Sequence, residues 1–503
     1  MANEKLSFQR LERRIVLDAV AWVGPNGGDW NLAANWFDST IGANRLPTSK
    51  DSVTIDTGGS TATVNILPGD NLTVGSLAIG SNDALSIARG SQLTVNGTFT
   101  QASGSTLDFS LNGTRGGLDY GLLDVQGSAA LGGTINVMLA AGYSPGPDDT
   151  YQPLLFASET GTPTVNDPAG ETDILTQTSL YVLPASSAIL SVTNTADSGS
   201  GSLRAAITTA NASASPVDLL TFDIPTSDPG YSAASGVWTI APRSALPTVI
   251  APAIIDAATQ SGYVGKPVVQ LAGGGAGSNV NGLNMNGGHS RVAGLAVGGF
   301  NGNGIELSGF GFDTLAGNFL GTDTSGNAAL ANSGNGIFVD DVGNNTIGGT
   351  TPGLANVVSG NGANGIFING VGASDNLVEG NFIGTNIAGA TALGNNGNGI
   401  QIAGGAVNNT IGGTAPGEGN VISGNGAAAG GGSAYGGVFI SDPGTAGNLL
   451  EGNFIGTDAA GTAVVANFGN GVAIQNGATN NTIGGTGAGA GNMISGNGYN
   501  GVF

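Results

Sequence analysis

The feature that most constrains this chain is internal repetition, because short strings rich in asparagine and glycine recur through its second half. Two of these strings each occur three times, NNTIGG beginning at Asn344, Asn408 and Asn480, and GNF(I/L)GT beginning at Gly317, Gly380 and Gly452. Copies of each string lie 63 to 72 residues apart, and strands of the NGI type recur every 29 to 36 residues. Each long repeat therefore corresponds to two coils of chain.

Each coil holds about three short strands, and each strand carries only one or two apolar side chains, such as Ile337 and Val339. Those side chains are buried only if the coils stack on one another. At about 4.8 Å per coil, roughly seven coils would form a rod near 35 Å long. The sequence thus predicts an all-β chain in which residues 276–503 form a right-handed parallel β-helix, a solenoid, preceded by a β-rich N-terminal module.

The recurrent asparagines have a structural interpretation in such a fold. Asparagine tolerates the left-handed backbone conformation that corners require, and stacked copies form amide ladders. We therefore assign a structural role, and not ligand binding, to the Asn/Gly positions of the coils. The predicted ladder residues are Asn335, Asn361, Asn398, Asn425, Asn470 and Asn497.

Composition excludes several classes of partner. The net charge is −22, and no lysine or arginine follows Arg291, so the surface is unsuited to nucleic acid, which is bound through clustered cations. The chain has no cysteine and a single histidine, His289, which excludes thiolate and imidazole-rich metal sites. No apolar run reaches the length of a membrane-spanning helix, so we expect no transmembrane segment.

The N-terminal segment, residues 1–21, carries a short motif. The string LERRIVLDA, from Leu11 to Ala19, resembles the LEPR-XLL-type motif near the start of very large exported bacterial proteins, with Arg13 where that motif has proline. The resemblance implies that residues 1–21 are an export or targeting segment. A basic amphipathic helix at the chain end is the alternative.

Residues 22–190 are predicted to form short strands separated by turns. The strings TATVNI, NLTVGSLAIG, ALSIARG, QLTVNGTFT, STLDFSL, LLDVQG and TINVML each alternate apolar and polar residues between Gly, Asn, Asp or Ser. The opening, with Trp22, Trp30 and Trp36, resembles passenger-type modules of autotransporter-like exported proteins. We expect the tryptophans to form a capping core, and a platform for sugar binding is the alternative.

Residues 191–275 contain a second motif. SGSLRAAI, ending at Ile207, resembles the CSLREA-type motif that introduces parallel β-helices in bacterial surface proteins, although Gly201 replaces its cysteine and Ala205 its glutamate. Leu203 to Asn211 has helical spacing and is predicted to be a short amphipathic cap. The resemblance implies that the first coils of the β-helix follow this cap.

Parallel β-helices often carry polysaccharide lyases and hydrolases, and both classes need particular acids and bases on one face of the helix. A lyase needs a basic residue on the helix face, and none occurs after Arg291. The nearest match to a hydrolase site is Asp340 and Asp341 with His289. As neighbours in one strand, the two aspartates would point to opposite faces, which is poor geometry for an acid and base pair. We predict that the chain is not an enzyme.

Calcium is the one cofactor that the sequence leaves open. Asp323 and Asp458 occupy equivalent positions in GTDTSGN and GTDAAGT, whereas Asn386 stands at that place in the middle copy. A Ca²⁺ site needs several oxygen ligands, so the two aspartates are candidate ligands only in combination with loop oxygens. Aspartates that close solvated turns are the alternative.

The sequence as a whole predicts a secreted or cell-surface bacterial protein that acts as a structural stalk or adhesin, with extracellular polysaccharide or cell-surface components as possible partners. The alternative is a carbohydrate-binding or polysaccharide-degrading β-helix module. The final string GNGYNGVF matches the start of an earlier coil, so we expect the β-helix to continue beyond Phe503 in a longer polypeptide.

Overall fold

The structure is a computed structural model that describes residues 18–503 except 115, 147–148, 351–352 and 427–435. The predicted export motif therefore lies almost entirely outside the described residues. The chain divides into two compact units, residues 1–144, 151–169 and 179–181 in the first and residues 145–150, 170–178 and 182–503 in the second. The predicted segment boundaries remain predictions.

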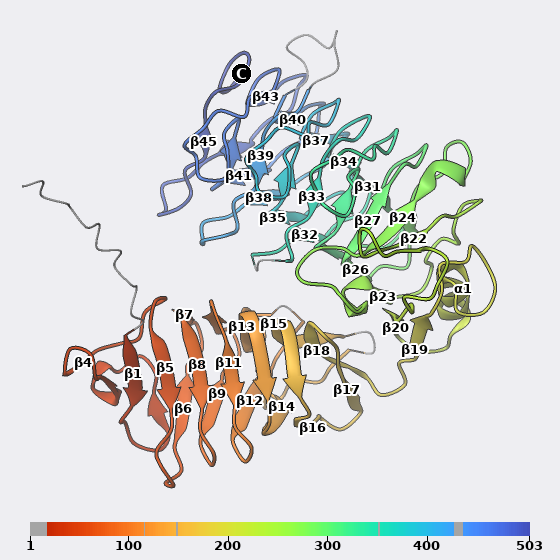
Figure 1. The fold of residues 1–503 in the computed structure, drawn as a ribbon. Helices are drawn as coiled ribbons and strands as arrows, with labels where there is room; N and C mark the ends of the chain where they lie inside the picture. The colour runs from red at the N-terminus through yellow and green to blue at the C-terminus, as the bar shows by residue number, and fades with distance from the viewer. Residues whose placement is uncertain (1–17, 115, 147–148, 351–352, 427–435) are drawn as a thin grey trace, which may run out of the picture. The chain divides into compact units, whose positions relative to one another are not determined.

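The N-terminal unit consists of two sheets of mainly parallel strands (Figure 1). The long sheet contains β1 (Ala19–Trp22), β3 (Trp36–Asp38), β4 (Ala43–Asn44), β5 (Ser52–Ile55), β7 (Asn71–Val74), β8 (Ser76–Ile79), β10 (Gln92–Val95), β11 (Phe99–Gln101), β13 (Leu122–Leu131) and β15 (Tyr151–Gly161). The short sheet contains β2 (Gly28–Asp29), β6 (Thr63–Ile66), β9 (Ala84–Ile87), β12 (Thr106–Leu111), β14 (Thr134–Leu139) and β16 (Thr164–Asn166). The seven strand-containing strings predicted from the sequence are all confirmed as strands.

The strands of this unit alternate buried and half-buried residues, as β5, β6 and β8 to β10 show. That alternation is the period-two pattern of a sheet with one face in the core. Trp22, Trp30 and Trp36 pack edge to face at its start and are each at most 3% exposed. The tryptophans therefore form a core, as expected, and they offer no exposed platform to a sugar. The strands β17 (Glu171–Leu175) and β18 (Ser179–Pro184) follow.

The C-terminal unit contains three further sheets. Sheet 1 consists of β19 (Ile189–Val192), β20 (Asp218–Phe222), β23 (Ala253–Asp256), β26 (Arg291–Ala293), β29 (Thr314–Ala316), β32 (Thr346–Gly348), β35 (Leu377–Glu379), β38 (Thr410–Gly412), β41 (Leu449–Glu451) and β44 (Thr482–Ile483). Sheet 2 consists of β21 (Tyr231–Ser232), β22 (Val237–Ile240), β24 (Val269–Ala272), β27 (Leu295–Gly298), β30 (Phe319–Leu320), β33 (Val357–Val358), β36 (Phe382–Ile383), β39 (Val421–Ile422), β42 (Phe454–Ile455) and β45 (Met493–Ile494). Sheet 3 consists of β25 (Leu283–Met285), β28 (Ile305–Leu307), β31 (Ile337–Asp340), β34 (Ile366–Asn369), β37 (Ile400–Ala403), β40 (Val438–Ile440) and β43 (Val472–Ile474).

Three consecutive strands, one in each of these sheets, make up what we call a rung, beginning with β23, β24 and β25. Each strand pairs in parallel with the corresponding strand of the next rung, so the seven strands of sheet 3 define seven successive rungs (Figure 1). The protein is thus all-β, with parallel strands of successive repeats stacked as in a β-solenoid.

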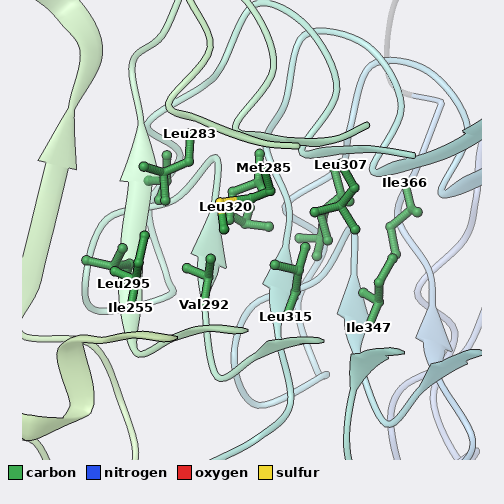
Figure 2. Packing of buried hydrophobic residues seen from close by; sticks show 14 of the residues in the cluster. Ile255, Leu283, Met285, Val292, Leu295, Leu307, Leu315, Leu320, Ile347 and Ile366 are labelled. Carbon is green, nitrogen blue, oxygen red and sulfur yellow. The ribbon is translucent and has the colours of Figure 1, made fainter. Parts of the chain in front are cut away.

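The core of this unit is a continuous column of aliphatic side chains. Leu315 from β29, Leu320 from β30 and Leu307 from β28 come from three different sheets and point into the same interior (Figure 2). The inward residue of each strand pairs with an inward residue one rung away, for example Ile337 with Ile366. One rung cannot bury these side chains alone, and stacking buries them almost completely.

The helix α1 (Leu203–Ala212) confirms the predicted helix from Leu203 to Asn211. Ser202 caps it, because its side chain accepts a hydrogen bond from the amide of Ala205. The apolar face, with Leu203 and Ile207, belongs to the same core cluster as the rungs, and the helix packs against β19 and β20. Three 3₁₀ helices, η1 (Ala33–Asn35), η2 (Ala257–Thr259) and η3 (Gly273–Gly275), complete the described elements.

Candidate functional site: asparagine columns and outer sheet faces

The corners between the sheets of the C-terminal unit carry four columns of stacked polar side chains. Column 1, before sheet 1, consists of Asp313, Asn345, Asn376, Asn409, Asn448 and Asn481. Column 2, between sheets 1 and 2, consists of Asn318, Asn356, Asn381, Asn420, Asn453 and Asn492. Column 3, after sheet 2, consists of Asn332, Asn361, Asn395, Asn425, Asn467 and Asn497. Column 4, before sheet 3, contains Asn303, Asn335, Asn364 and Asn398 and, two rungs later, Asn470 and Asn500.

Within a column, each amide group uses its donors and its acceptor. The backbone amide and the Nδ2 of Asn376 both donate to Oδ1 of Asn409, over 3.0 and 2.8 Å, and the same Nδ2 also donates to the carbonyl of Val342. Asn376 Oδ1 in turn accepts two hydrogen bonds from Asn345. An asparagine side chain has two donors and one acceptor oxygen, so the column satisfies it while it is buried.

The six predicted ladder residues belong to two different columns. Asn361, Asn425 and Asn497 lie in column 3, and Asn335, Asn398 and Asn470 lie in column 4. The two columns differ in the direction of their hydrogen bonds. In column 3 each asparagine donates to the following rung, whereas in column 4 it donates to the preceding rung. Column 4 is interrupted at Gly436, whose amide donates to Oδ1 of Asn398.

The sequence interpretation missed the asparagines that alternate with the predicted ones, such as Asn332 and Asn395 in column 3. The signal was present as a spacing of three residues, because Asn332 precedes Asn335 and Asn395 precedes Asn398 in strings of the form N-x-G-N-G. Columns 1 and 2 were missed as well. Their members include the second asparagine of NNTIGG, such as Asn345, and the asparagine of GNF, such as Asn381.

The left-handed conformation that asparagine tolerates at corners is found at other asparagines than the six. Asn344, Asn408 and Asn480, each directly before a column 1 asparagine, have φ values of 60°, 58° and 56°. The six predicted residues are not among the described residues with positive φ. At each of these corners the first asparagine is exposed and adopts the left-handed conformation, and the asparagine that follows it points inward and joins column 1.

The candidate calcium ligands close their own turns. Asp323 Oδ1 accepts hydrogen bonds from the amide and the hydroxyl of Ser325, and Asp458 accepts from the amides of Thr462 and Ala463. Those amide hydrogen bonds lower the pKa of the Asp458 carboxyl. Asn386, at the equivalent place, accepts from the amides of Ala390 and Thr391, so an uncharged side chain performs the same task. Among the described residues there is no group of three or more acidic, His or Cys side chains placed to hold a metal ion.

Asp340 and Asp341 lie at the corner between sheets 3 and 1, and His289 lies at the same corner two rungs earlier. Asp340 is the last residue of β31, whereas Asp341 follows the strand with a φ of 58° and accepts a hydrogen bond from the amide of Gly372. The prediction that both aspartates lie in one strand is therefore wrong, because the left-handed residue ends the strand. His289 is exposed, also has positive φ, and stacks on Phe312 with a ring-centroid distance of 4.9 Å.

The outer faces of the sheets carry aromatic residues together with charged residues, such as Glu306 on sheet 3 and Glu379 on sheet 1. On sheet 3, Phe338 and Phe367 stack on one another with centroids 5.3 Å apart, so each covers a ring face that a sugar would need. Over sheet 2 lies a cavity of about 490 Å³, lined by Phe382, Val421, Phe454 and glycine-rich loops that include Gly413 to Gly417. None of the described residues that line this cavity is titratable.

No protein-family model matches the chain, and a search of curated proteins found no match. None of the helices among the described residues is long and apolar enough to cross a membrane. Function must therefore be argued from the columns, the outer faces and the cavity themselves.

Proposed function

We propose that this chain is a non-catalytic structural protein, secreted or displayed on a bacterial surface, whose C-terminal unit is a right-handed parallel β-helix. The observation that carries the proposal is the set of asparagine columns. The buried asparagines of the four columns are committed to hydrogen bonds between rungs, so they hold the rungs together and are not free to bind a ligand. Crossover connections between parallel strands of one sheet are right-handed in about 98% of cases, which supports the proposed handedness.

The environment of the remaining polar groups supports the same proposal. Acid–base catalysis needs a titratable side chain, and none of the described residues that line the cavity over sheet 2 is titratable. The stacked rings of Phe338 and Phe367 cover one another, so a sugar would meet ring edges instead of ring faces. The LEPR-XLL-like and CSLREA-like strings, which resemble motifs of exported bacterial proteins, favour an extracellular location. A stalk or adhesin is the role that needs a long, self-supporting stack and little else.

The test is binding and turnover of the 503-residue chain against a panel of neutral and acidic polysaccharides, with Ca²⁺ and with a chelator. We expect neither reducing ends nor unsaturated products. Binding without turnover would favour an adhesin, and no binding would favour a stalk. Turnover would contradict the proposal. A double variant, Asp340→Asn with Asp341→Asn, is the matched control, because loss of turnover in it would locate the activity at that corner.

A further inference from the structure

Asp313 is the one carboxylate among the described members of the asparagine columns. It occupies the first position of column 1, where each later rung has an asparagine, and it is 1% exposed. Its register is that of the column: its backbone amide donates to Oδ1 of Asn345 over 2.9 Å, and its Oδ1 accepts from the amide of Ser290 over 2.9 Å. Asp313 thus occupies a position that belongs to an asparagine on each later rung.

The difference lies at the second oxygen. Every later column 1 member that has a following partner uses Nδ2 to donate to the next Oδ1, over 2.8 to 2.9 Å. Because Oδ1 of Asp313 takes the acceptor role, Oδ2 stands in the place of that donor. Oδ2 is buried and has no hydrogen-bond partner among the described residues. If Asp313 is ionised, Oδ2 is an acceptor that faces another acceptor, Oδ1 of Asn345, and no hydrogen bond can form between them. A buried polar atom without a hydrogen-bond partner lowers the stability of the fold.

A protonated carboxyl removes the conflict, because it has one O–H donor and one carbonyl acceptor, the arrangement of an amide that has lost one of its two N–H groups. We propose that Asp313 is a proton-binding site at the head of column 1, where the acid form donates from Oδ2 to Oδ1 of Asn345. The column then has a donor at every rung from Asp313 onward. Loss of the proton breaks the column at its first step.

The surroundings allow the acid form near neutral pH. Burial raises the pKa of the Asp313 carboxyl to about 7, against the opposing effect of the Ser290 amide. The titratable side chains on the nearest rungs of this corner are exposed, His289 one rung earlier and Asp341 and Asp375 on the rungs that follow. Arg291 begins the neighbouring strand β26, and the buried Asp218 lies three rungs earlier. None of these five contributes to the pKa shift of Asp313, which arises from burial.

The consequence is a joint between rungs that responds to pH. Below the pKa the proton completes the contact between the rungs that contain β29 and β32. As pH rises through the pKa, the carboxylate faces Asn345 without a donor, and the strands β26, β29 and β32 are expected to open more often. The other columns contain amides only and give no such response.

The experiment uses the full chain and two readouts. Hydrogen exchange of peptides that cover β26, β29 and β32, corrected for the intrinsic pH dependence of exchange, is expected to lose protection by about tenfold or more between about pH 5 and about pH 9. The comparison is made in a Glu379→Gln background, because Glu379 in the neighbouring strand β35 also has a pKa raised to about 7. In that background Asp313→Asn, which supplies a permanent donor, should abolish the loss. Asp323→Asn, at an exposed turn, is the matched control and should behave as the original chain does.

The second readout is measured first on the unsubstituted chain. Infrared spectra of the chain labelled with ¹³C at aspartate carboxyls should show the band of a buried protonated carboxylic acid at about pH 5, which disappears as pH rises through the carboxyl's pKa. Asp313→Asn should lack this band. The proposal is overturned if the acid band is absent at low pH, or if Asp313→Asn keeps the pH-dependent loss of protection.

Discussion

The two units stack parallel strands in the same way but satisfy the polar groups at their corners differently. In the N-terminal unit many of these bonds stay within one turn, as where Asp70 accepts from the amide of Leu67, and some join neighbouring turns, as where Asp83 accepts from the amides of Thr57 and Ala62. A short stack of Asp108, Asn136 and Asn166 lies on the outer face of the short sheet. In the C-terminal unit the bonds run from rung to rung through buried columns.

This difference explains why only the C-terminal unit shows repeated strings in its sequence. A turn that satisfies its own groups accepts many residue combinations, so successive turns need not resemble one another. A column needs an amide at each rung, because a missing member leaves buried donors on its neighbour without partners. Repetition in the sequence is therefore a consequence of how the corners are satisfied and not of strand stacking as such.

The largest loss of stability is expected from a substitution at the charged corner of the N-terminal unit, which has no counterpart in the uncharged columns of the repeats. Arg45 donates to the buried Asp38 and to Asp51, and it also pairs with Asp18. Arg45→Met would leave Asp38 and Asp51, whose side chains are 0% and 3% exposed, without their cation, so the N-terminal unit is expected to unfold at a clearly lower urea concentration. Urea unfolding in a Trp238→Phe background, followed by the fluorescence of the N-terminal tryptophans, measures the loss. Lys50→Met, at an exposed position, should leave the curve unchanged.

A smaller loss is expected from breaking a column in its middle. In Asn381→Leu, the backbone amide and Nδ2 of Asn356 lose the oxygen that they share, although this Nδ2 keeps its bond to the carbonyl of Leu315. Each unsatisfied buried donor costs about 1–3 kcal/mol, so the expected loss is about 2–4 kcal/mol. Hydrogen exchange in urea, read separately for each rung, measures it, because repeat arrays do not always unfold in one step.

Asn136→Leu, in the exposed stack of the N-terminal unit, is the variant to compare with Asn381→Leu. Asn136 is only half buried and joins Asp108 and Asn166, which both lie toward solvent. Water replaces these hydrogen bonds, so the expected loss stays below about 1 kcal/mol. Equal losses in the two variants would contradict the distinction between buried columns and exposed stacks.

Much of the fold was predictable because strand alternation and amide recurrence are local properties of the sequence. The strands of the N-terminal unit follow from alternating residues such as those of β12, and the rungs follow from the repeated strings. The helix α1 was predictable for the same reason, since Leu203 and Ile207 recur at helical spacing.

The rest depended on which residues share a column, and this is a property of three-dimensional register. Asp313 precedes a threonine as Asn345 does, but GFDT does not resemble GNNT closely enough to reveal an equivalent site. Only the pairing of β29 with β32 places the carboxyl in line with the amides. Asp341 was assigned to a strand because no local signal distinguishes an aspartate that takes a left-handed corner from one that continues a strand.

The stability of the two units is expected to change with pH in opposite directions. Burial, and next the negative charge of Glu418, raise the pKa of Glu379 to about 7 from its ordinary 4.5. The unfolded chain therefore ionises first, and this contribution to stability is present below about pH 4.5 and is lost as pH rises through about 7. Hydrogen bonds from Arg45 lower the pKa of Asp51, so stability of the N-terminal corner is lost instead as pH falls.

Glu379→Gln isolates the effect in the C-terminal unit. The variant should gain about 1–3 kcal/mol relative to the original chain at about pH 9 compared with about pH 4, because glutamine cannot ionise. Urea unfolding of both chains across this range, with hydrogen exchange to assign the change to β35 and its neighbours, measures the gain. Asp51→Asn should reduce the acid sensitivity of the N-terminal unit. A common direction in both variants would contradict the contrast.

The smallest effect concerns chemical ageing. Asn-Gly pairs deamidate when the glycine amide nitrogen attacks the asparagine Cγ, ammonia leaves, and water opens the cyclic imide. In column 3 this attack is blocked, because the amide of Gly362 donates to the carbonyl of Asn332 and that of Gly426 to the carbonyl of Asn395. The Nδ2 groups of Asn361 and Asn425 are also held in the column.

Exposed Asn-Gly pairs at turns lie outside the columns, Asn96 in the N-terminal unit and Asn476 in the repeats. During long incubation at mildly alkaline pH, peptide mapping should find deamidation first at these two sites, while column 3 asparagines change only after the chain is unfolded in urea. Because the rate depends on local opening, Asn361 should react faster in Asn381→Leu than in the original chain. Equal rates at Asn361 and Asn476 in the folded chain would mean that the columns open too often to protect their members, and the contrast between the two kinds of corner would then concern geometry alone.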